Sequence, residues 1–306
     1  MSTYVAGYDV EAVYAWWESE HTVHTGDNYD DVVSYEGEKL DECIAGVRAV
    51  AEVHLELNAP ATFFIVAKLL DSATAQLVEI LDQPIFEIAC HSYSHPDVKE
   101  YLNDESRLRY EVVDSKKAIE DAFGRSVIGF TTPGGYENGY MGEPRFVELL
   151  WESGYRYIRS VGCGPSLSMP APLHQPFWYS NEGAPGLLEI PLHAWHDNTL
   201  TGQQGLVSWP PTLPWSYPSE MPTDARGVYE AYAPGIEHTA ESGLAIYQPT
   251  FHPWSIYRVD QQASQIAMLL DHAIGTLEIS SCADVYRTFA NDPDLAGKRP
   301  DLATAV

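Results

Sequence analysis

Apolar and polar positions along this chain alternate in a way that predicts strands and helices in turn. Short apolar runs indicate buried strands, and the stretches between them carry apolar residues at every third or fourth position, as amphipathic helices do. The predicted strands are TYVAGYD, ATFFIV, IFEIAC, SVIGFTT, YRYIRSV, GLLEIPLHAW, LAIYQPTFH and LEISSC. The predicted helices span residues 40–57, 74–81, 105–123, 145–152 and 260–274, and a last one begins at Ala283. Such alternation is typical of an α/β fold with a parallel sheet.

Two stretches interrupt this alternation. Residues 162–234 are rich in Pro, Trp and Tyr and show few helical periods, and residues 16–37 form a second irregular stretch. Because disordered segments are poor in aromatic residues, we interpret the longer stretch as ordered loops. The length of 306 residues suits one α/β barrel with insertions. We therefore expect a single catalytic domain over residues 1–306, with these loops folded over the end of the barrel at which the strands finish.

The charge balance narrows the choice of partners. The chain has 17 Lys and Arg against 44 Asp and Glu, a formal net charge of −27 at pH 7. A surface this acidic repels polyanions, which argues against nucleic acid and anionic membranes. The N-terminus lacks the pattern of a secretion signal, no apolar run could span a bilayer, and the four cysteines form no CxxC pair. These features favour a cytoplasmic protein with buried free thiols and a small-molecule or oligosaccharide substrate, and they leave a homo-oligomer open.

Polar residues follow several of the predicted strands. Asp9 and Glu11 close the first strand, His91 follows IFEIAC, Pro133 follows GFTT, and His252 follows LAIYQPT. Because the carboxyl ends of parallel strands meet at one edge, we expect these groups to share a pocket. Residues two apart on a strand face the same side, so Asp9 and Glu11 bring two carboxylates to one place.

The segment HSYSH holds His91 and His95 four residues apart. If the chain turns helical there, both imidazoles project from one face and can bind one divalent ion. One carboxylate of the Asp9 and Glu11 pair can be a further ligand, which leaves the other to act as a base. For the motif taken alone, two histidines that help a loop to pack are the alternative.

Other side chains are candidates for substrate contacts. His193 and His196 follow another predicted strand, tryptophan faces stack on sugars and rings, and a glycine pair lets a backbone N–H approach an oxyanion. Packing remains the alternative for the two histidines and the tryptophans. The candidates are Pro133, Gly134, Tyr136, His193, Trp195, His196 and Trp254. The chain has no GxSxG elbow and no cysteine in a nucleophile context, which argues against covalent catalysis by Ser or Cys.

In these segments the chain resembles the polysaccharide-deacetylase family, also called the NodB-homology or carbohydrate esterase 4 family. The matching segments are GYDVEAV, APATFFIVA, FEIACHSYSHPDV, GFTTPGGY and LAIYQPTFHP, over roughly residues 4 to 290. The resemblance implies a distorted, incomplete (β/α) barrel whose divalent metal, usually zinc, is held by an acid and two histidines. Here that ligand set corresponds to His91, His95 and Glu11, with Asp9 as the other possible acid.

Two departures from the common family pattern point to a subgroup. The usual adjacent Asp pair is here Asp9-Val-Glu11, spaced as in members that resemble cytosolic peptidoglycan deacetylases, allantoinases or cyclic-imide hydrolases. The resemblance then implies Asp9 as the base and Glu11 as the ligand, with the exchanged roles open. The family's arginine two residues before the proline is Thr131 here, so the resemblance implies that the arginine that orients the base is missing and that Asp9 has no arginine partner. This departure makes chitin-like substrates less favoured.

The implied activity is metal-dependent hydrolysis of an amide, in which Asp9 accepts a proton from water and His252 protonates the leaving nitrogen. The leading substrate is an N-acetylated sugar or a related amide. The alternative substrate is a cyclic amide such as allantoin or an imide. The missing secretion signal favours this alternative, because cell-wall polymer lies outside the cytosol. A non-catalytic carbohydrate-binding module with the same fold is a third hypothesis, which the retained acids and histidines disfavour.

Overall fold

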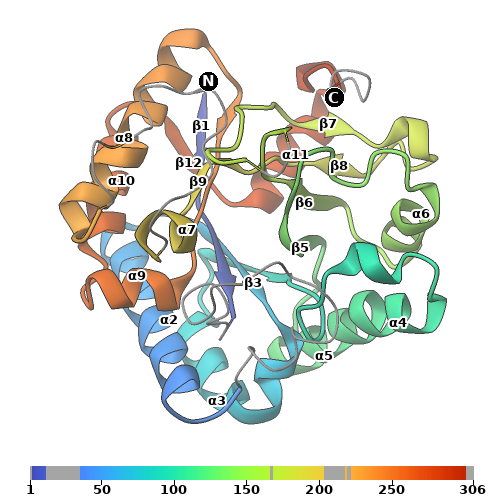
Figure 1. Cartoon of the computed structure of the whole chain (residues 1–306), viewed down its shortest axis with the longest axis horizontal. Coiled ribbons are helices and arrows are strands. Elements are labelled where there is room, and N and C mark those ends of the chain that lie inside the picture. Colours follow the sequence, from blue (N-terminus) through green and yellow to red (C-terminus); the bar gives the residue numbers. More distant parts are fainter. Residues whose placement is uncertain (1, 12–34, 166–167, 203–217, 219–221, 301–306) are drawn as a thin grey trace.

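The computed structural model describes residues 2–11, 35–165, 168–202, 218 and 222–300, with strands at the centre and helices around them (Figure 1). The strands are β1 (Thr3–Val5), β2 (Gly7–Val10), β3 (Ala61–Ile65), β4 (Phe86–Cys90), β5 (Gly129–Tyr136), β6 (Tyr157–Val161), β7 (Phe177–Trp178), β8 (Leu188–Glu189), β9 (His193–His196), β10 (Ile246–Tyr247), β11 (Pro249–Thr250) and β12 (Glu278–Ser280). The helices are α2 (Gly37–Leu57), α3 (Leu70–Leu81), α4 (Glu105–Arg109), α5 (Ser115–Phe123), α6 (Pro144–Glu152), α7 (Asp197–Gly202), α8 (Ala225–Ser242), α9 (Pro253–Val259), α10 (Ser264–Ile274) and α11 (Cys282–Asn291). The expected α/β class is confirmed.

The strands follow one another around a distorted barrel. The main sheet has the order β2-β3-β4-β5-β6-β8-β7 and is parallel apart from the β7–β8 pair. In a second sheet β1 lies between β10 and β12, and β9 pairs with β11. Single hydrogen bonds continue the ring, from Asp9 N to Phe251 O (2.9 Å) and from Leu192 N to Val161 O (2.8 Å). These short, irregular links agree with the incomplete (β/α) barrel that the family resemblance implies.

Burial on both faces explains the apolar character of the central strands. All five residues of β3 are buried, as expected for a parallel strand covered by helices. Outside the strands, α2 packs closely on α9. Glycine at position 46 allows this approach, because a Cβ added there would lie 2.2 Å from the Pro253 carbonyl oxygen. His252 is the residue that precedes α9, so this close contact helps to fix its position.

Three expectations about secondary structure were wrong. The segment GLLEIPLHAW forms two strands, β8 and β9, because Pro191 between them has no N–H to donate. The stretch expected to be loop up to residue 234 already contains the first turns of α8, which continues through Pro234. The helix expected from Asp260 is α10, which starts at Ser264 and follows the unexpected α9. The expected insertion near 16–37 lies outside the described residues except for its last three.

The helix expected over residues 105–123 is interrupted in its middle. A π-helical turn, Tyr110–Asp114, separates α4 from α5. A π turn carries one extra residue and changes the direction in which the following side chains point. Glu111 in this turn is buried and contacts the loop after β4.

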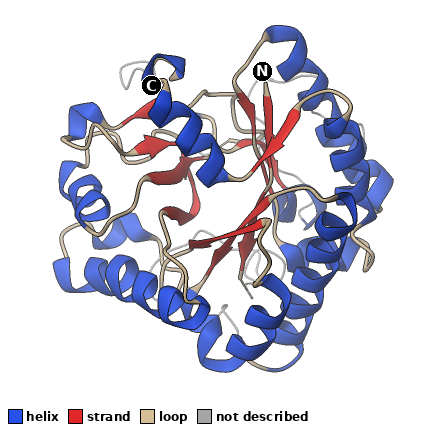
Figure 2. Cartoon of the chain, turned by 180° about the vertical axis from the view of Figure 1, so that it is seen from behind, coloured by secondary structure: helices blue, strands red, loops and turns tan. Residues whose placement is uncertain are grey.

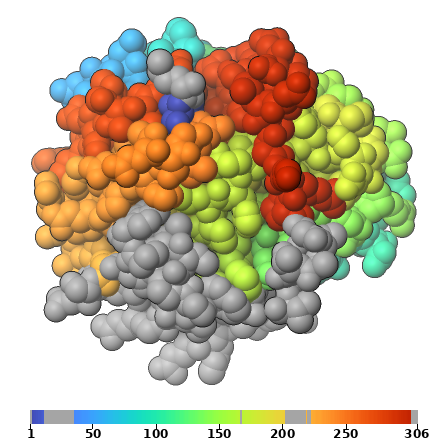
Figure 3. Space-filling view, turned by 90° about the horizontal axis from the view of Figure 1, so that it is seen from above, coloured from blue at the N-terminus to red at the C-terminus, as the bar shows by residue number. Residues whose placement is uncertain are grey.

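The C-terminal segment packs against residues 176–182. Figure 3 shows this segment, in red, lying against residues of the chain's middle part. Gly297 N donates to Pro176 O (2.7 Å), and the Arg299 guanidinium pairs with the Glu182 carboxylate (2.6 Å). Among the described helices, none combines the length and apolar character that a bilayer span requires. The cysteines are buried free thiols, as expected.

Helix α11 begins at the end of the barrel where the strands start, and Figure 2 shows it crossing that side. Cys282 N donates to Thr62 Oγ1 (2.8 Å), and Ala283 N donates to Glu87 Oε2 (2.7 Å). The Tyr157 hydroxyl donates to Glu87 Oε1 (2.8 Å). Burial nevertheless raises the pKa of Glu87 to about 7, since these hydrogen bonds offset only part of the desolvation.

We expect Glu87→Gln to flatten the pH dependence of stability. Glu87 has a pKa of about 7 in the folded protein against an ordinary value of 4.5, so the folded state binds more protons between these values. The stability from this group is therefore fully present below about pH 4.5 and is lost as the pH rises through about 7, a change of roughly 3 kcal/mol. Urea unfolding between about pH 5 and 8 measures it, with Glu79→Gln on the surface as the control. Equal slopes for wild type and Glu87→Gln would contradict this account.

Candidate active site

The chemical groups expected from the sequence meet at the end of the barrel where the strands finish. Asp9 lies in β2, His91 follows β4, and His252 follows β11. They border a cavity of about 20 Å³, which is room for one ion or water. The cavity is lined by Asp9, Glu11, His91, His95, Gly134, Leu192, His196, Asn198 and His252.

Glu11, His91 and His95 form a buried cluster of possible ligands. Glu11 Oε2 lies 3.2 Å from His91 Nε2 and 2.5 Å from His95 Nε2. Burial would raise the pKa of Glu11, but His95 and His252 outweigh it and hold that pKa well below its ordinary value. One atom from each of the three residues lies within 4.8 Å of the others. Two imidazole nitrogens and a carboxylate oxygen are the donor set of catalytic zinc sites, so these residues fit a divalent metal.

The HSYSH loop is not helical in the structure, so the helical turn considered from the histidine spacing is absent. Ser92 and His95 instead have left-handed backbone conformations, with φ of 62° and 65°. Ser92 Oγ accepts a hydrogen bond from His95 N (3.0 Å), and His91 Nδ1 contacts the Thr131 carbonyl oxygen at 3.2 Å. This second contact of His91 directs its Nε2 toward Glu11, as outer contacts do at metal sites.

Asp9 forms an ion pair with an arginine that the sequence motifs did not indicate. Its Oδ1 accepts a hydrogen bond from Arg159 Nη2, and both side chains are buried. Arg159 lies opposite Thr131 in the pairing of β5 with β6, and its Nε donates to Thr131 Oγ1 (3.1 Å). Asp9 is thus contacted by an arginine from the strand adjacent to Thr131. The expectation that Asp9 lacks an arginine partner was wrong.

His252 is held by an aspartate that was also missed. Its Nδ1 lies 2.5 Å from Asp197 Oδ1, and its backbone N–H donates to the same carboxylate. Its Nε2 points toward the acids, 3.6 Å from Glu11 Oε1 and 3.9 Å from Asp9 Oδ2. Burial alone would lower the pKa of His252, but Glu11 and Asp197 outweigh burial and raise it. His252 can therefore carry a proton at the edge of the cavity.

Two of the expected substrate-contact residues line the cavity. Gly134 lies there with a φ of 72°, a conformation that glycine adopts without strain. His196 also lines the cavity, with its Nε2 2.9 Å from the Gly162 carbonyl oxygen. Burial and then the nearby His252 lower the pKa of His196 to about 3, so its ring is neutral.

His193 and Trp195 are placed away from the cavity lining. His193 Nε2 contacts the His174 carbonyl oxygen (2.6 Å), and its Nδ1 accepts from Gln248 N (3.0 Å). Both ring nitrogens of His193 are therefore used by the backbone, which favours a packing role. Trp195 is buried in the apolar core, where its carbonyl oxygen accepts from the Tyr232 hydroxyl.

The remaining candidates lie around the site rather than in its lining. Pro133 is buried in β5 beside Gly134. The Tyr136 hydroxyl donates to Asp97 Oδ1 (2.6 Å), which joins the GFTTPGGY segment to the loop after β4. Trp254 is buried, and its indole N–H lies 3.4 Å from Glu11 Oε1. Trp254 thus contacts a possible ligand and not the open space.

Some residues at the site gave only weak signals in the sequence. Arg159 is a charged residue inside the buried strand YIRSV, and Asp197 directly follows HAWH. A buried charge requires a partner, so both positions could have been singled out. Asn198 also lines the cavity, and its buried Oδ1 has no hydrogen-bond partner in the part of the chain that the structure describes.

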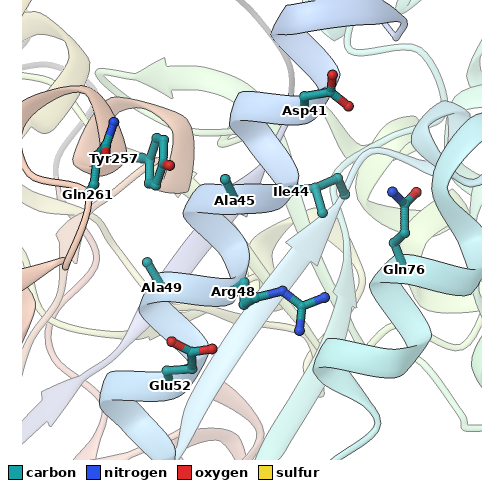
Figure 4. A pocket seen from close by; sticks show the side chains of 9 residues that line it. All are labelled: Asp41, Ile44, Ala45, Arg48, Ala49, Glu52, Gln76, Tyr257 and Gln261. Atoms are coloured by element: carbon teal, nitrogen blue, oxygen red, sulfur yellow. The ribbon is translucent and has the colours of Figure 1, made fainter.

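A second, more open hollow of about 440 Å³ lies on the outer surface between α2, α3 and α9 (Figure 4). Ala45 and Ala49 form its floor, Arg48 points along it, and Tyr257 stands at one side. The Arg48 guanidinium pairs with Glu79 at 3.3 Å on the exposed surface. This hollow is formed by the outer helices and contains none of the residues of the cavity at the strand ends.

Comparisons with known proteins give a family match for one segment and structural matches over nearly the whole chain. The family model of polysaccharide deacetylases matches residues 41–157. A candidate polysaccharide deacetylase from Mycobacterium smegmatis is 18% identical, with a TM-score of 0.66 over 98% of this chain and 95% of that one. Puue allantoinase is 16% identical, with a TM-score of 0.64 over 95% and 90%. A candidate polysaccharide deacetylase from Pseudomonas aeruginosa PAO1 is 14% identical, with a TM-score of 0.67 over 95% of this chain and 91% of that one.

No curated protein sequence matches the chain significantly. At such low identities the structural likeness concerns the fold, and the family match concerns the segment that carries both histidines of the cluster. The resemblance inferred from the sequence is therefore confirmed: the chain has the fold of the polysaccharide deacetylases, and its residues 41–157 match that family.

Proposed function

We propose that this chain is a metal-dependent hydrolase of a non-peptide amide bond that removes the acetyl group from an N-acetylated sugar or a related amide. The observation that carries the proposal is the buried cluster of Glu11, His91 and His95 beside Asp9 and His252. The family match supports hydrolysis of acetylated carbohydrates or amides. We also propose that residues 1–306 form one catalytic domain, and that its acidic surface suits a cytoplasmic location.

Glu11, His91 and His95 would hold the metal, and their donor set favours zinc. When bound, a divalent metal supplies Lewis acidity, which lowers the pKa of water to about 7 and polarises a carbonyl group. Within the described part of the chain three protein ligands converge, so a metal held by them would have room for water or substrate.

Asp9 would be the general base. Its Oδ1 is engaged by Arg159, and its Oδ2 lies toward His252 and the cavity. The arginine fixes the orientation of the carboxylate, so that its other oxygen can accept a proton from water. Arg159 is thus a positioning residue for Asp9.

His252 would be the general acid. Asp197 holds Nδ1, which leaves Nε2 directed at the reacting groups with a proton to donate. An amide nitrogen leaves poorly as an anion, so its departure requires this proton. Burial lowers the pKa of His252, but the carboxylates of Glu11 and Asp197 outweigh it and raise that pKa, which favours the protonated ring.

Hydrolysis of a cyclic amide is a second candidate, and Asn198 favours it. The carboxamide of Asn198 lines the cavity and presents an acceptor beside a donor. A ring holds its amide cis, so a cyclic ureide shows N–H and C=O on one edge that such a carboxamide can match. The acetamido group of an N-acetyl sugar is trans and shows them on opposite edges. The fold likeness to Puue allantoinase agrees with this candidate.

A substrate panel with controlled metal content tests the proposal. The protein stripped by a chelator should be inactive, and added zinc should restore release of acetate from N-acetylglucosamine oligomers. Ring opening of allantoin or a cyclic imide without acetate release would select the second candidate. Sugar binding without turnover by zinc-loaded protein would indicate a non-catalytic module and contradict the proposal.

The same assay examines His252 through its leaving-group dependence. His252→Ala should slow hydrolysis of an amide far more than that of an activated ester, because an ester leaving group of low pKa departs without a proton. Equal losses on both substrates would remove the general-acid role and leave the metal-dependent hydrolase in place.

A further inference from the structure

The loop that carries both histidines has an unusual backbone. Ser92 and His95 have positive φ, a conformation that costs free energy in residues other than glycine. The residues between β4 and Val98 form no helix or strand of their own. Contacts from elsewhere must therefore hold this loop in the shape that brings His91 and His95 together.

Backbone N–H groups of Ala67 and Lys68 hold the carbonyl groups of Ser92 and Tyr93. On the amide side of the loop, the contacts come from Glu111. Its Oε2 accepts hydrogen bonds from Tyr93 N (2.8 Å) and Ser94 N (2.9 Å), and its Oε1 accepts from Ser94 Oγ (2.7 Å). Arg107 Nη2 lies 3.1 Å from Glu111 Oε1 and also donates to Ser94 Oγ (3.0 Å). Glu111 is 1% exposed, so little water competes for these contacts. One carboxylate thus satisfies two consecutive backbone N–H groups between the histidines.

The π-helical turn determines where the Glu111 side chain lies relative to the HSYSH loop. Glu111 lies inside the turn Tyr110–Asp114, while Arg107 lies one turn earlier in α4. Single π turns cost helix regularity and are frequent at functional sites. The contacts to the HSYSH loop offer a reason for the irregularity here, because they depend on where this turn places Glu111.

We propose that Glu111 is a positioning residue that shapes the HSYSH loop so that His91 and His95 offer their nitrogens to one metal ion. The inference rests on the metal centre of the proposed function. A carboxylate is required because every neighbour within hydrogen-bond distance is a donor: two backbone N–H groups, the Ser94 hydroxyl and the Arg107 guanidinium. A carboxamide would turn its NH₂ group toward one of these donors.

The test is the affinity for zinc, measured by competition with a chromophoric chelator. Glu111→Gln should weaken zinc binding by roughly 10- to 100-fold, the usual effect of losing an outer contact at a metal site. Glu120→Gln is the matched control, because Glu120 lies farther along the same helical run and its carboxylate accepts from Val127 N (2.9 Å), away from the histidines. The control should keep the wild-type zinc affinity even if it lowers the melting temperature.

Ser94→Ala provides a second measurement that does not depend on removing a buried charge. It deletes the hydroxyl that joins Glu111 to Arg107 and leaves both backbone hydrogen bonds in place. We expect zinc binding to weaken several-fold in a folded protein. Wild-type zinc affinity in Glu111→Gln, or in Ser94→Ala if Glu111→Gln does not fold, would overturn the positioning role. A wild-type protein that binds no zinc would instead overturn the proposed metal centre itself.

Discussion

Replacing His91 or His95 with Ala is expected to abolish zinc binding and amide hydrolysis while leaving the fold in place. Each variant leaves two of the three clustered ligands, which is too few to hold the ion against water. Loss of the metal removes several kcal/mol of transition-state stabilisation, so activity should fall at least about a thousand-fold. Both variants should still fold, because the strands and helices of the barrel are unchanged, but the melting temperature should fall, since the buried Glu11 carboxylate loses a partner.

Metal content by mass spectrometry and a circular-dichroism melt check this expectation together. His272→Ala is a suitable control, because His272 lies in α10 and outside the cavity lining. The control should keep both zinc and activity. Full zinc occupancy in both site variants would falsify the ligand assignment.

Asp9→Asn should retain zinc but slow the reaction by roughly two to four orders of magnitude, the usual contribution of a positioned general base. The substitution keeps the shape of the side chain and removes its ability to accept a proton. Glu11→Gln should instead reduce the affinity for zinc, because Glu11 contacts both histidines of the proposed site. Zinc content and single-turnover rates of the two variants measure the difference.

The arginine beside Asp9 offers an internal check. Arg159→Lys keeps the charge but loses the planar fork that contacts Asp9 and Thr131 together. It should give a milder form of the Asp9→Asn loss, with zinc retained. If Asp9→Asn loses zinc and Glu11→Gln keeps it, the roles of the two carboxylates must be exchanged.

The hydrophobic pattern predicted the central strands well, since a short apolar run such as ATFFI in β3 has few other uses in an α/β protein. The hydrophobic pattern was less informative where a proline interrupts an apolar run. Pro191 divides one apolar segment into β8 and β9, and these strands join different sheets. The first turns of α8 went unnoticed because Pro, Trp and Tyr dominate the composition before it.

At the site, the rule that groups gather at strand ends was sufficient to bring Asp9, Glu11, His91 and His252 together. It could not find Arg159, because its contact with Asp9 depends on which strands become neighbours and in what register. The family resemblance implied an arginine at position 131, where this chain has threonine, and in the structure an arginine from the facing position on β6 contacts Asp9. Such an exchange across a strand pair is invisible until the pairing is known.

The position of β1 has a consequence for the synthesis of the protein. Thr3 pairs with Ile246 in β10 and with Glu278 in β12, so β1 is synthesised long before either of its partner strands. Contacts between such distant residues slow folding and expose unpaired strand edges meanwhile. The carboxylates of Asp9 and Glu11 follow this strand directly. A nascent chain therefore carries the two histidines of the proposed metal site long before it can complete the barrel around them.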